Sequence, residues 1–208
     1  MFYCELPKVW QRIFQLEWQS VCEGSKAIAA VIADSDGNIL SEGRNMISEC
    51  GVPNPATAHA EAEAIRNLDV SRFPAPKTYT LYAGLEPCIM CMGTLVMGHI
   101  RHVEIAARDN FGGAMGLIQL SPFARSKGIS IKWLDNELSD MQRAVQTIRE
   151  LIYNKDEEKR GRMLADFAEL NKTGVEAAKA LYESGFFSGK TLYDITAEEV
   201  FDELMNKF

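Results

Sequence analysis

Two short motifs impose a shared metal centre on this chain and so restrict how it can fold. The first is His59-Ala60-Glu61 and the second is Pro87-Cys88-Ile89-Met90-Cys91. An imidazole and two thiolates suit zinc, and three protein ligands leave a fourth coordination position for water, as in catalytic sites. We therefore expect a fold that brings His59, Cys88 and Cys91 together around one Zn²⁺ ion.

Both motifs are expected at the beginnings of helices. Pro87 suits a helix start, and Cys88 and Cys91 would then share one face of that helix. A helix N-terminus favours thiolate over thiol, which prepares both cysteines for a metal. The pattern from Ala60 to Leu68 is also helical, so His59 is expected in a first turn.

One carboxylate is left over once the ligands are assigned. Zinc lowers the pKa of its bound water to about 7 and so makes hydroxide available. Attack on a ring carbon that carries an amine then needs a group that moves protons to the ring nitrogen and to the departing ammonia. Glu61, beside the ligand histidine, is the candidate for this catalytic role, and Glu86 is the next.

Three other interpretations of the motifs explain less. A structural zinc site needs a fourth ligand, but the remaining histidines, His99 and His102, follow the second motif as single polar residues. A redox Cys-x-x-Cys pair would not need the His-Ala-Glu motif. An inactive zinc-binding relic would have no use for Glu61, which is not a ligand in sites of this kind.

Apolar patterns along the chain predict strands that alternate with helices. The predicted strands are 27–33, 39–43, 78–83, 103–107 and 129–134, and the predicted helices include 2–23, 88–97 and one capped by Asn136. The segment 34–38 is a strong turn signal, which makes the first two strands a hairpin. Alternation of this kind favours one sheet with helices on both faces and places both motifs at strand-to-helix junctions.

The C-terminal part has a different pattern. Three glycines, Gly174, Gly185 and Gly189, predict breaks between two or three short helices, and Thr196-Ala197-Glu198-Glu199 is a capping box. No linker rich in proline or serine precedes it, so we expect a domain of residues 1–154 with residues 155–208 as a helical extension docked on it. A cover over core surface is the expected role, and a substrate lid or dimer contact is the alternative.

Four segments together resemble a known family of enzymes. They are Gly43-Arg44-Asn45, Thr57 to Ala62, Leu85 to Cys91 and Ala107-Arg108-Asp109. Their order and spacing resemble the cytidine and deoxycytidylate deaminase superfamily, and within it the bacterial tRNA adenosine deaminases and guanine deaminases. The resemblance covers roughly residues 5–154 and implies an α/β fold, a three-layer α/β/α cytidine-deaminase-like sheet with helices on both faces.

The resemblance also implies roles for further residues. In the resembling enzymes an asparagine at the position of Asn45 binds the base, and the backbone amide at the position of Ala60 contacts the substrate. A turn residue is the alternative role for Asn45. Phe111 could stack on a ring from a mobile loop or belong to the core, and Arg108 and Asp109 more often serve a structural purpose than a catalytic one.

Charge bears on the substrate. The chain carries 22 basic and 29 acidic side chains, a formal net charge of −7, and residues 155–208 contribute 8 and 12 of these. Polynucleotide binding relies on many Lys and Arg contacts to phosphates, so a free nucleobase, nucleoside or related aminated heterocycle is favoured. The motifs favour a purine-like substrate; a tRNA adenosine-to-inosine deaminase and a cytosine or cytidine-type deaminase are the alternatives.

The expected setting is cytoplasmic. Charged residues interrupt the first eighteen positions, and no apolar run is long enough for a membrane span. Two of the five cysteines are assigned to the metal, and Cys4, Cys22 and Cys50 are expected to be reduced. Related enzymes are commonly oligomers, so a homodimer is expected, with Met90, Met92 and Met97 in its interface or in the core.

Overall fold

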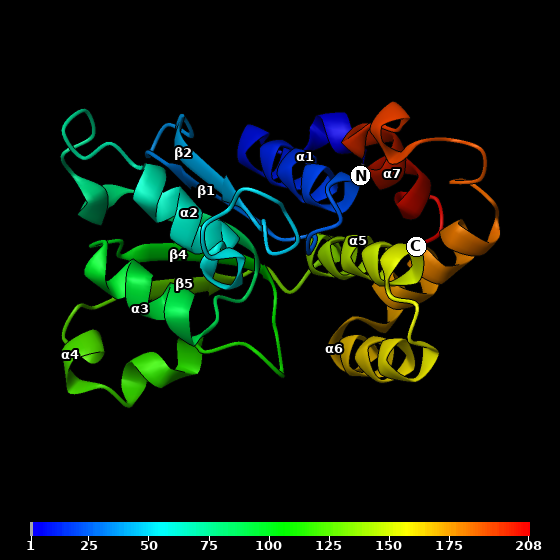
Figure 1. Ribbon diagram of the computed structural model, residues 1–208. Helices are drawn as coiled ribbons and strands as arrows, with labels where there is room; N and C mark the ends of the chain where they lie inside the picture. The colour runs from blue at the N-terminus through cyan, green and yellow to red at the C-terminus, as the bar shows by residue number, and fades with distance from the viewer. Residues whose placement is uncertain (1) are drawn as a thin grey trace.

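A computed structural model describes residues 2–208 and contains one mixed sheet with helices on both faces (Figure 1). The strands are β1 (Ala29–Ala33), β2 (Ile39–Arg44), β3 (Thr80–Leu85), β4 (His102–Ala107) and β5 (Ser130–Trp133). The helices are α1 (Lys8–Cys22), α2 (Ala60–Asn67), α3 (Ile89–Met97), α4 (Pro122–Arg125), α5 (Glu137–Tyr153), α6 (Glu157–Glu183) and α7 (Ala197–Met205).

The sheet has the strand order β2-β1-β3-β4-β5. β1 is antiparallel to both of its neighbours, while β3, β4 and β5 run parallel to one another. The predicted turn at 34–38 joins β1 to β2, with Gly37 at a φ of 81° that favours glycine. Parallel pairs need a crossover, and α3 supplies the one between β3 and β4.

Each face of the sheet packs on its own set of helices. Alternate residues of β1 point to opposite faces, so Val31 joins the core beneath α1 and α5 while Ile32 joins the core beneath α2 and α3. All five residues of β1 are buried, as expected of a strand covered on both faces. The three-layer α/β/α arrangement predicted from the sequence is confirmed.

The C-terminal segment forms longer helices than predicted. α6 has 27 residues, with a single non-helical residue, Asn171 (φ −132°, ψ 55°), at a kink. Gly174 lies inside α6, so the prediction of a helix break there was wrong. Close packing of two helices explains the glycine at position 174. A Cβ atom here would collide with the backbone carbonyl of Asp140 on α5, so the absence of a side chain allows the two helices to approach.

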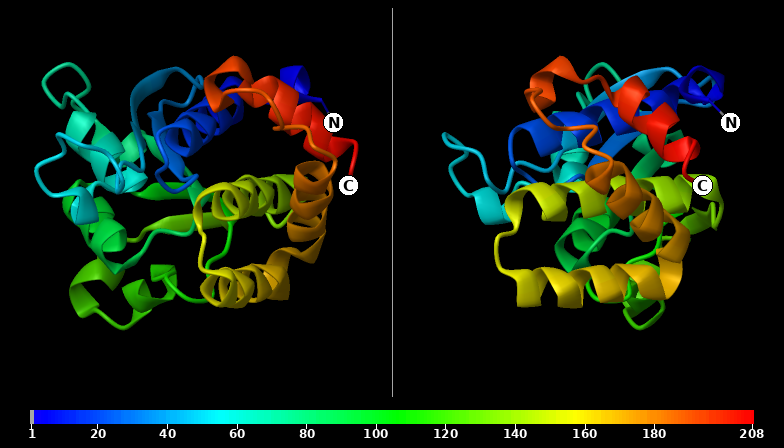
Figure 2. Two further views of the ribbon diagram at one scale, coloured as in Figure 1. Left: turned by 45° about the vertical axis from the view of Figure 1, so that its right-hand side comes forward. Right: turned by 90° about the vertical axis from the view of Figure 1, so that its right-hand side faces the viewer.

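The last helix packs beside the N-terminal segment (Figure 2). Phe201 of α7 makes edge-to-face contacts with Tyr3 and with Phe14 of α1. Thr196 and Glu199 form the predicted capping box at the start of α7. Side chains of α6 and α7 thus complete the core on the α1–α5 face, and the division at residue 154 stays a prediction. Within residues 2–208, no helix is both long and apolar enough to cross a bilayer.

Candidate metal centre and active site

The three predicted ligands meet at the beginnings of two helices. His59 is the N-cap residue of α2, Cys88 is the N-cap residue of α3, and Cys91 lies in the first turn of α3. Their ligand atoms all lie within 4.8 Å of one another, and Cys88 Sγ is 3.5 Å from His59 Nδ1. These distances let a single ion reach all three side chains.

Close packing of α2 on the sheet places His59. Gly43 of β2 faces the first turn of α2, where a Cβ atom would collide with the carbonyl oxygen of Ala60. Cys88 is placed by chain continuity, since β3 ends at Leu85 and α3 begins at Ile89. Both ligand-bearing helices therefore start at the same edge of the sheet, as predicted.

The donors are electrostatically suited to a divalent ion. Hydrogen bonds from Cys91 and His59 lower the pKa of the Cys88 thiol to about 3. Cys91 is fully buried, and its interaction with Cys88 together with burial raises its pKa. The partnership with Cys88 likewise raises the pKa of His59. The three groups share protons at positions where a metal would replace them, so the donor set fits Zn²⁺.

Glu61 lies beside the ligands without joining them. Its side chain is 4% exposed, and burial raises its pKa, an effect opposed by hydrogen bonds from its own backbone and from Cys91. Among the residues that the structure describes, the group able to hold a metal consists of His59, Cys88 and Cys91 and does not include Glu61. This carboxyl is thus available for a role other than coordination.

The two predicted substrate contacts lie at the same edge. Asn45 is buried, and its Oδ1 accepts hydrogen bonds from the backbone N–H groups of Lys26 and Ile47, at 3.3 and 3.1 Å, which gives it a turn-stabilising role. Ala60 is fully buried, and it begins α2, where backbone N–H groups lack helical acceptors. Substrate binding by Asn45 and Ala60 stays a prediction.

Glu86 has a structural task. Its carboxylate oxygens accept hydrogen bonds from the backbone N–H groups of Asp109 and Met115, at 3.2 and 3.1 Å. These bonds fix the loop that follows β4. No local signal in the sequence predicts them, because the partners lie far along the chain. The role of Glu61 as the proton carrier stays a prediction.

A buried arginine holds the same loop from the other side and was not singled out from the sequence. Arg143 of α5 is 1% exposed, donates to the carbonyl of Arg108 at 2.7 Å and lies 3.5 Å from Asp109 Oδ1. Arg108 itself pairs with Asp135 at 3.1 Å. Arg108 and Asp109 are structural, as expected, but they do not pair with each other: Arg108 pairs with Asp135, and Asp109 pairs with Arg143.

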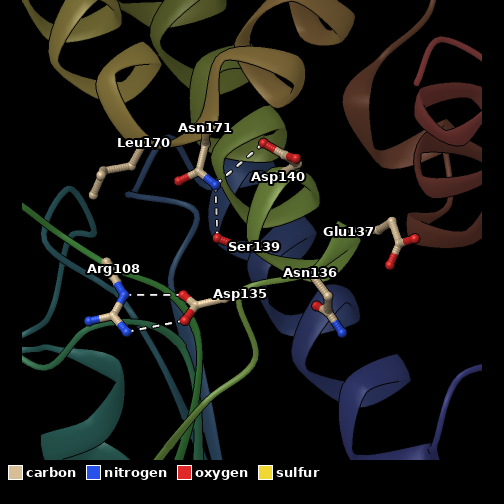
Figure 3. Close-up of a pocket in the computed structure, with 8 residues that line it drawn as sticks. All are labelled: Arg108, Asp135, Asn136, Glu137, Ser139, Asp140, Leu170 and Asn171. Atoms are coloured by element: carbon tan, nitrogen blue, oxygen red, sulfur yellow. Dashed lines mark hydrogen bonds and ion pairs between the residues drawn. The ribbon is translucent and has the colours of Figure 1, made fainter.

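Two pockets lie along the extension. One, of about 570 Å³, surrounds the kink of α6 and is lined by polar groups, including the Arg108–Asp135 pair and Asn171, which donates to Ser139 and Asp140 (Figure 3). It contains none of the metal-site residues. The other, of about 600 Å³, is largely apolar and lies where strands of the sheet end; it is also lined by none of the metal-site residues. Phe111 lines it and is 92% exposed, so the alternative that it belongs to the core was wrong.

Comparison with known proteins agrees with the geometry. The sequence model of the cytidine and deoxycytidylate deaminase zinc-binding region matches residues 6–107, which include both motifs. Over these residues the chain is similar to the members of this superfamily. Because the matched region is a zinc-binding one in these deaminases, Zn²⁺ is the ion that fits the site.

Individual deaminases match over part of their length. A tRNA-specific adenosine deaminase of Haemophilus influenzae is 32% identical over 111 residues, which are 52% of this chain and 62% of that protein. A cytosine deaminase of Candida albicans is 34% identical over 98 residues, 46% of this chain and 61% of that protein. The chain thus spans less than two thirds of these relatives.

A solved structure supports the fold. The protein NE0047, in complex with 2,6-diaminopurine, superposes on this chain with a TM-score of 0.52 at 19% identity. The superposed region covers 71% of this chain and 84% of the NE0047 chain. At that identity the likeness concerns the architecture alone. It agrees with the deaminase fold of the chain.

Proposed function

We propose that this protein is a zinc-dependent hydrolase that removes an exocyclic amine from a small purine-like heterocycle and releases ammonia. The observation that carries the proposal is the buried Glu61 carboxyl beside a His-Cys-Cys group that it does not join. A three-ligand zinc site leaves room for a water, and a separate carboxylate can move its protons.

The chain's own residues account for the proton movements. Bound zinc would supply a water whose pKa is lowered to about 7. Glu61 takes a proton from the nucleophile and gives it to the ring nitrogen as the C–O bond forms. Glu61 then takes the remaining proton from the added hydroxyl group and transfers it to the amine, the C–N bond breaks, ammonia leaves, and the added oxygen becomes the carbonyl. The Ala60 N–H and the Asn45 side chain would hold the ring.

The charge balance supports a small substrate. The chain has a formal net charge of −7. Several cations near the site are already paired, with Lys26 bonded to Glu150 at 2.5 Å and Arg143 facing Asp109. Polynucleotide binding needs many free cations along the phosphate backbone. A neutral base or nucleoside therefore fits this site better than an RNA.

Similarity to two relatives supports two alternative functions. Similarity to the tRNA-specific adenosine deaminase of Haemophilus influenzae supports conversion of adenosine to inosine in tRNA. Similarity to the cytosine deaminase of Candida albicans supports deamination of a pyrimidine base. Both alternatives use the same metal centre and the same carboxylate, so only the substrate distinguishes them.

A substrate screen tests the proposal. The zinc-loaded chain should release ammonia from at least one of guanine, adenine and adenosine, and Glu61→Gln should reduce turnover by about 10²-fold or more while zinc is retained. Cytosine, cytidine and an adenosine-containing tRNA anticodon stem-loop complete the panel. The stem-loop is tested near 50 mM salt, because phosphate-driven binding weakens by orders of magnitude by about 200 mM.

The outcomes of the screen are distinct. Inosine formation in the stem-loop with no turnover of free bases or nucleosides would replace the proposal with tRNA editing. Turnover of cytosine alone would replace it with a pyrimidine deaminase. Unchanged turnover in Glu61→Gln would contradict the role of that carboxylate.

We also propose a homodimer in the cytoplasm. Exposed apolar side chains gather on α3 and on the adjoining segments 115–119 and α4, and they include Ile89, Met97, Leu120 and Phe123. Apolar patches of this kind mark protein interfaces. Sedimentation equilibrium of the wild type and of a Leu120→Asp variant would test the dimer.

A further inference from the structure

The largely apolar pocket lies where α6 passes the edge of the sheet. Its walls come from separate parts of the chain: Ile28 before β1, Leu85 at the end of β3, Phe111 in the loop after β4, and Met163 and Phe167 of α6. The volume is about 600 Å³, within the range of small-molecule sites. α6 lies outside residues 6–107, the part of the chain that carries the zinc-binding region.

The pocket adjoins the metal centre through shared backbone. Leu85, in its wall, leads through Glu86 and Pro87 directly to Cys88. The carbonyl of Ile28, another wall residue, accepts a hydrogen bond of 2.9 Å from the backbone N–H of Asn45. A molecule whose amine reached the metal centre could therefore place its remaining atoms in this pocket.

Specific contacts hold α6 and the loop together at the pocket. Asn110 donates from Nδ2 to Glu169 Oε2 of α6 at 2.8 Å. The Phe167 ring covers the buried guanidinium of Arg143, whose Cζ is 4.6 Å from the ring centroid. Phe111, next to Asn110, remains 92% exposed at the rim. The walls are thus fixed, while the Phe111 ring is free to contact a ligand.

Charged groups of both signs surround the apolar wall. The pocket is lined by the cations Lys26, Arg143, Lys159 and Arg162 and by the carboxylates Asp109 and Asp166. Three of the cations have an acidic partner: Lys26 pairs with Glu150, Arg143 with Asp109, and Arg162 with Glu158. A flat ring would meet carbon surfaces on several sides of the pocket.

We propose that α6 completes the substrate pocket, and that Phe111, Met163 and Phe167 form an apolar wall that binds the ring system of a base or nucleoside. The proposal rests on the proposed deaminase function for the identity of the ligand. It gives the C-terminal extension a part in specificity in addition to covering the core.

The test combines equilibrium binding with kinetics on the full chain. 2-Aminopurine, a fluorescent base, is titrated against zinc-loaded Glu61→Gln protein alone and combined with Phe111→Ala or Met163→Ala. In each of these two variants, the loss of one apolar contact should raise the Kd of 2-aminopurine by about tenfold. Leu170→Ala is the matched control, because Leu170 lies on α6 but lines the other pocket, and it should change Kd by less than about twofold.

Turnover provides a second readout. In the background with Glu61 intact, Phe111→Ala and Met163→Ala should raise KM for the best base or nucleoside by about tenfold and leave kcat within about twofold, because the wall binds substrate and transition state alike. Thermal melting of each variant confirms that the fold is retained, which is expected for the exposed Phe111.

Each outcome decides between the two proposals. Unchanged Kd and KM in both wall variants would overturn the pocket assignment even in an active deaminase. Failure of 2-aminopurine to bind the zinc-loaded protein would also overturn it. Binding of 2-aminopurine that the wall variants weaken, with no ammonia released from any base or nucleoside, would support the pocket and remove the proposed function.

Discussion

At the scale of single residues, the metal centre depends on where two helices begin. His59 and Cys88 are both N-cap residues, so their side chains project from helix ends and lie near unpaired backbone N–H groups. The partial positive charge at a helix N-terminus stabilises thiolates. Helix starts therefore supply the positions of the ligands, while hydrogen bonds from Cys91 and His59 lower the pKa of Cys88.

The metal assignment gives the first prediction. Cys91→Ala should abolish stoichiometric zinc and lower Tm by at least about 2 °C, because metal binding contributes to the free energy of folding. Zinc per chain by elemental analysis and a melting curve measure both effects. Cys50→Ala is the control. Cys50 is exposed and is not one of the three ligands, so this variant should retain the metal. Full zinc occupancy in a Cys88→Ala, Cys91→Ala double variant would contradict the ligand set.

A second buried carboxyl lies behind the site. Glu17 of α1 is fully buried, and Gly84 of β3 leaves the space for it, since a Cβ atom there would collide with Glu17 Oε1. Burial raises the pKa of Glu17 well above its ordinary value. Neither carboxyl oxygen of Glu17 has a hydrogen-bond partner within residues 2–208, which favours the uncharged, protonated carboxyl.

Glu17 gives the second prediction. The folded protein holds a proton that the unfolded chain releases above about pH 4.3, so this group's stabilising effect is complete below that pH and is lost as pH rises towards the folded pKa. Glu17→Gln should increase the free energy of unfolding at pH 7 and flatten its pH dependence above pH 5. Urea titrations from pH 4.5 to 8 measure this. The exposed Glu183→Gln is the control, and a wild-type pH profile in Glu17→Gln would count against the prediction.

At the scale of elements, the kinked helix α6 depends on one close helix contact. The Asp140 side chain on α5 accepts hydrogen bonds from Asn171 Nδ2 and from the backbone N–H of Gly174, both at 3.3 Å. The bond to Gly174 gives an acceptor to a backbone N–H group near the kink, and the bond to the Asn171 side chain holds the kink residue against α5. The absence of a side chain at Gly174 makes this contact possible.

The kink gives the third prediction. Gly174→Ala should destabilise the protein by about 1–3 kcal/mol, because its methyl group would collide with the Asp140 backbone. Gly161→Ala, in the same helix with open space around it, should be neutral or stabilise by up to about 1 kcal/mol. Urea denaturation of both variants provides the comparison. Equal effects would show that helix propensity, and not the α5 contact, governs position 174.

At the scale of the whole molecule, the C-terminal extension completes the core of the α1–α5 face. Phe201 and Leu204 of α7 and Ala178 and Leu181 of α6 are buried there. The indole N–H of Trp18 donates to the carbonyl of Ile195 at 2.6 Å inside the protein. Removal of the extension would expose apolar surface and leave this donor without its partner.

Truncation after Asn154 gives the fourth prediction. The shortened chain should aggregate, or melt well below the full chain, because it loses apolar partners for α1. Size-exclusion chromatography and melting curves measure the outcome. A milder variant, Phe201→Ala, should lower stability by about 3–5 kcal/mol without deleting any segment. A monodisperse 1–154 chain with the full Tm would show that the first 154 residues form an independent domain.

The sequence by itself determined the strands, the hairpin, the starts of α2, α3 and α5, and the three candidate metal ligands. These features depend on local signals: alternation of apolar residues, turn residues such as Gly37, caps such as Asn136, and ligand types at fixed spacing. Each is complete within a short segment, so no knowledge of distant contacts is needed. The helix predicted over 2–23 was too long at its N-terminal end: α1 begins at Lys8, because Leu6, the residue before Pro7, is extended.

Only the tertiary structure decided how the parts around the site meet. Glu86 and Arg143 fix the loop after β4 through partners far along the chain, and Gly174 lies within α6 because of a contact with α5. An apolar or polar pattern shows which side chains are buried but not which element covers them. The pocket between Phe111 and α6 is therefore a property of packing, since long-range contacts bring its walls together.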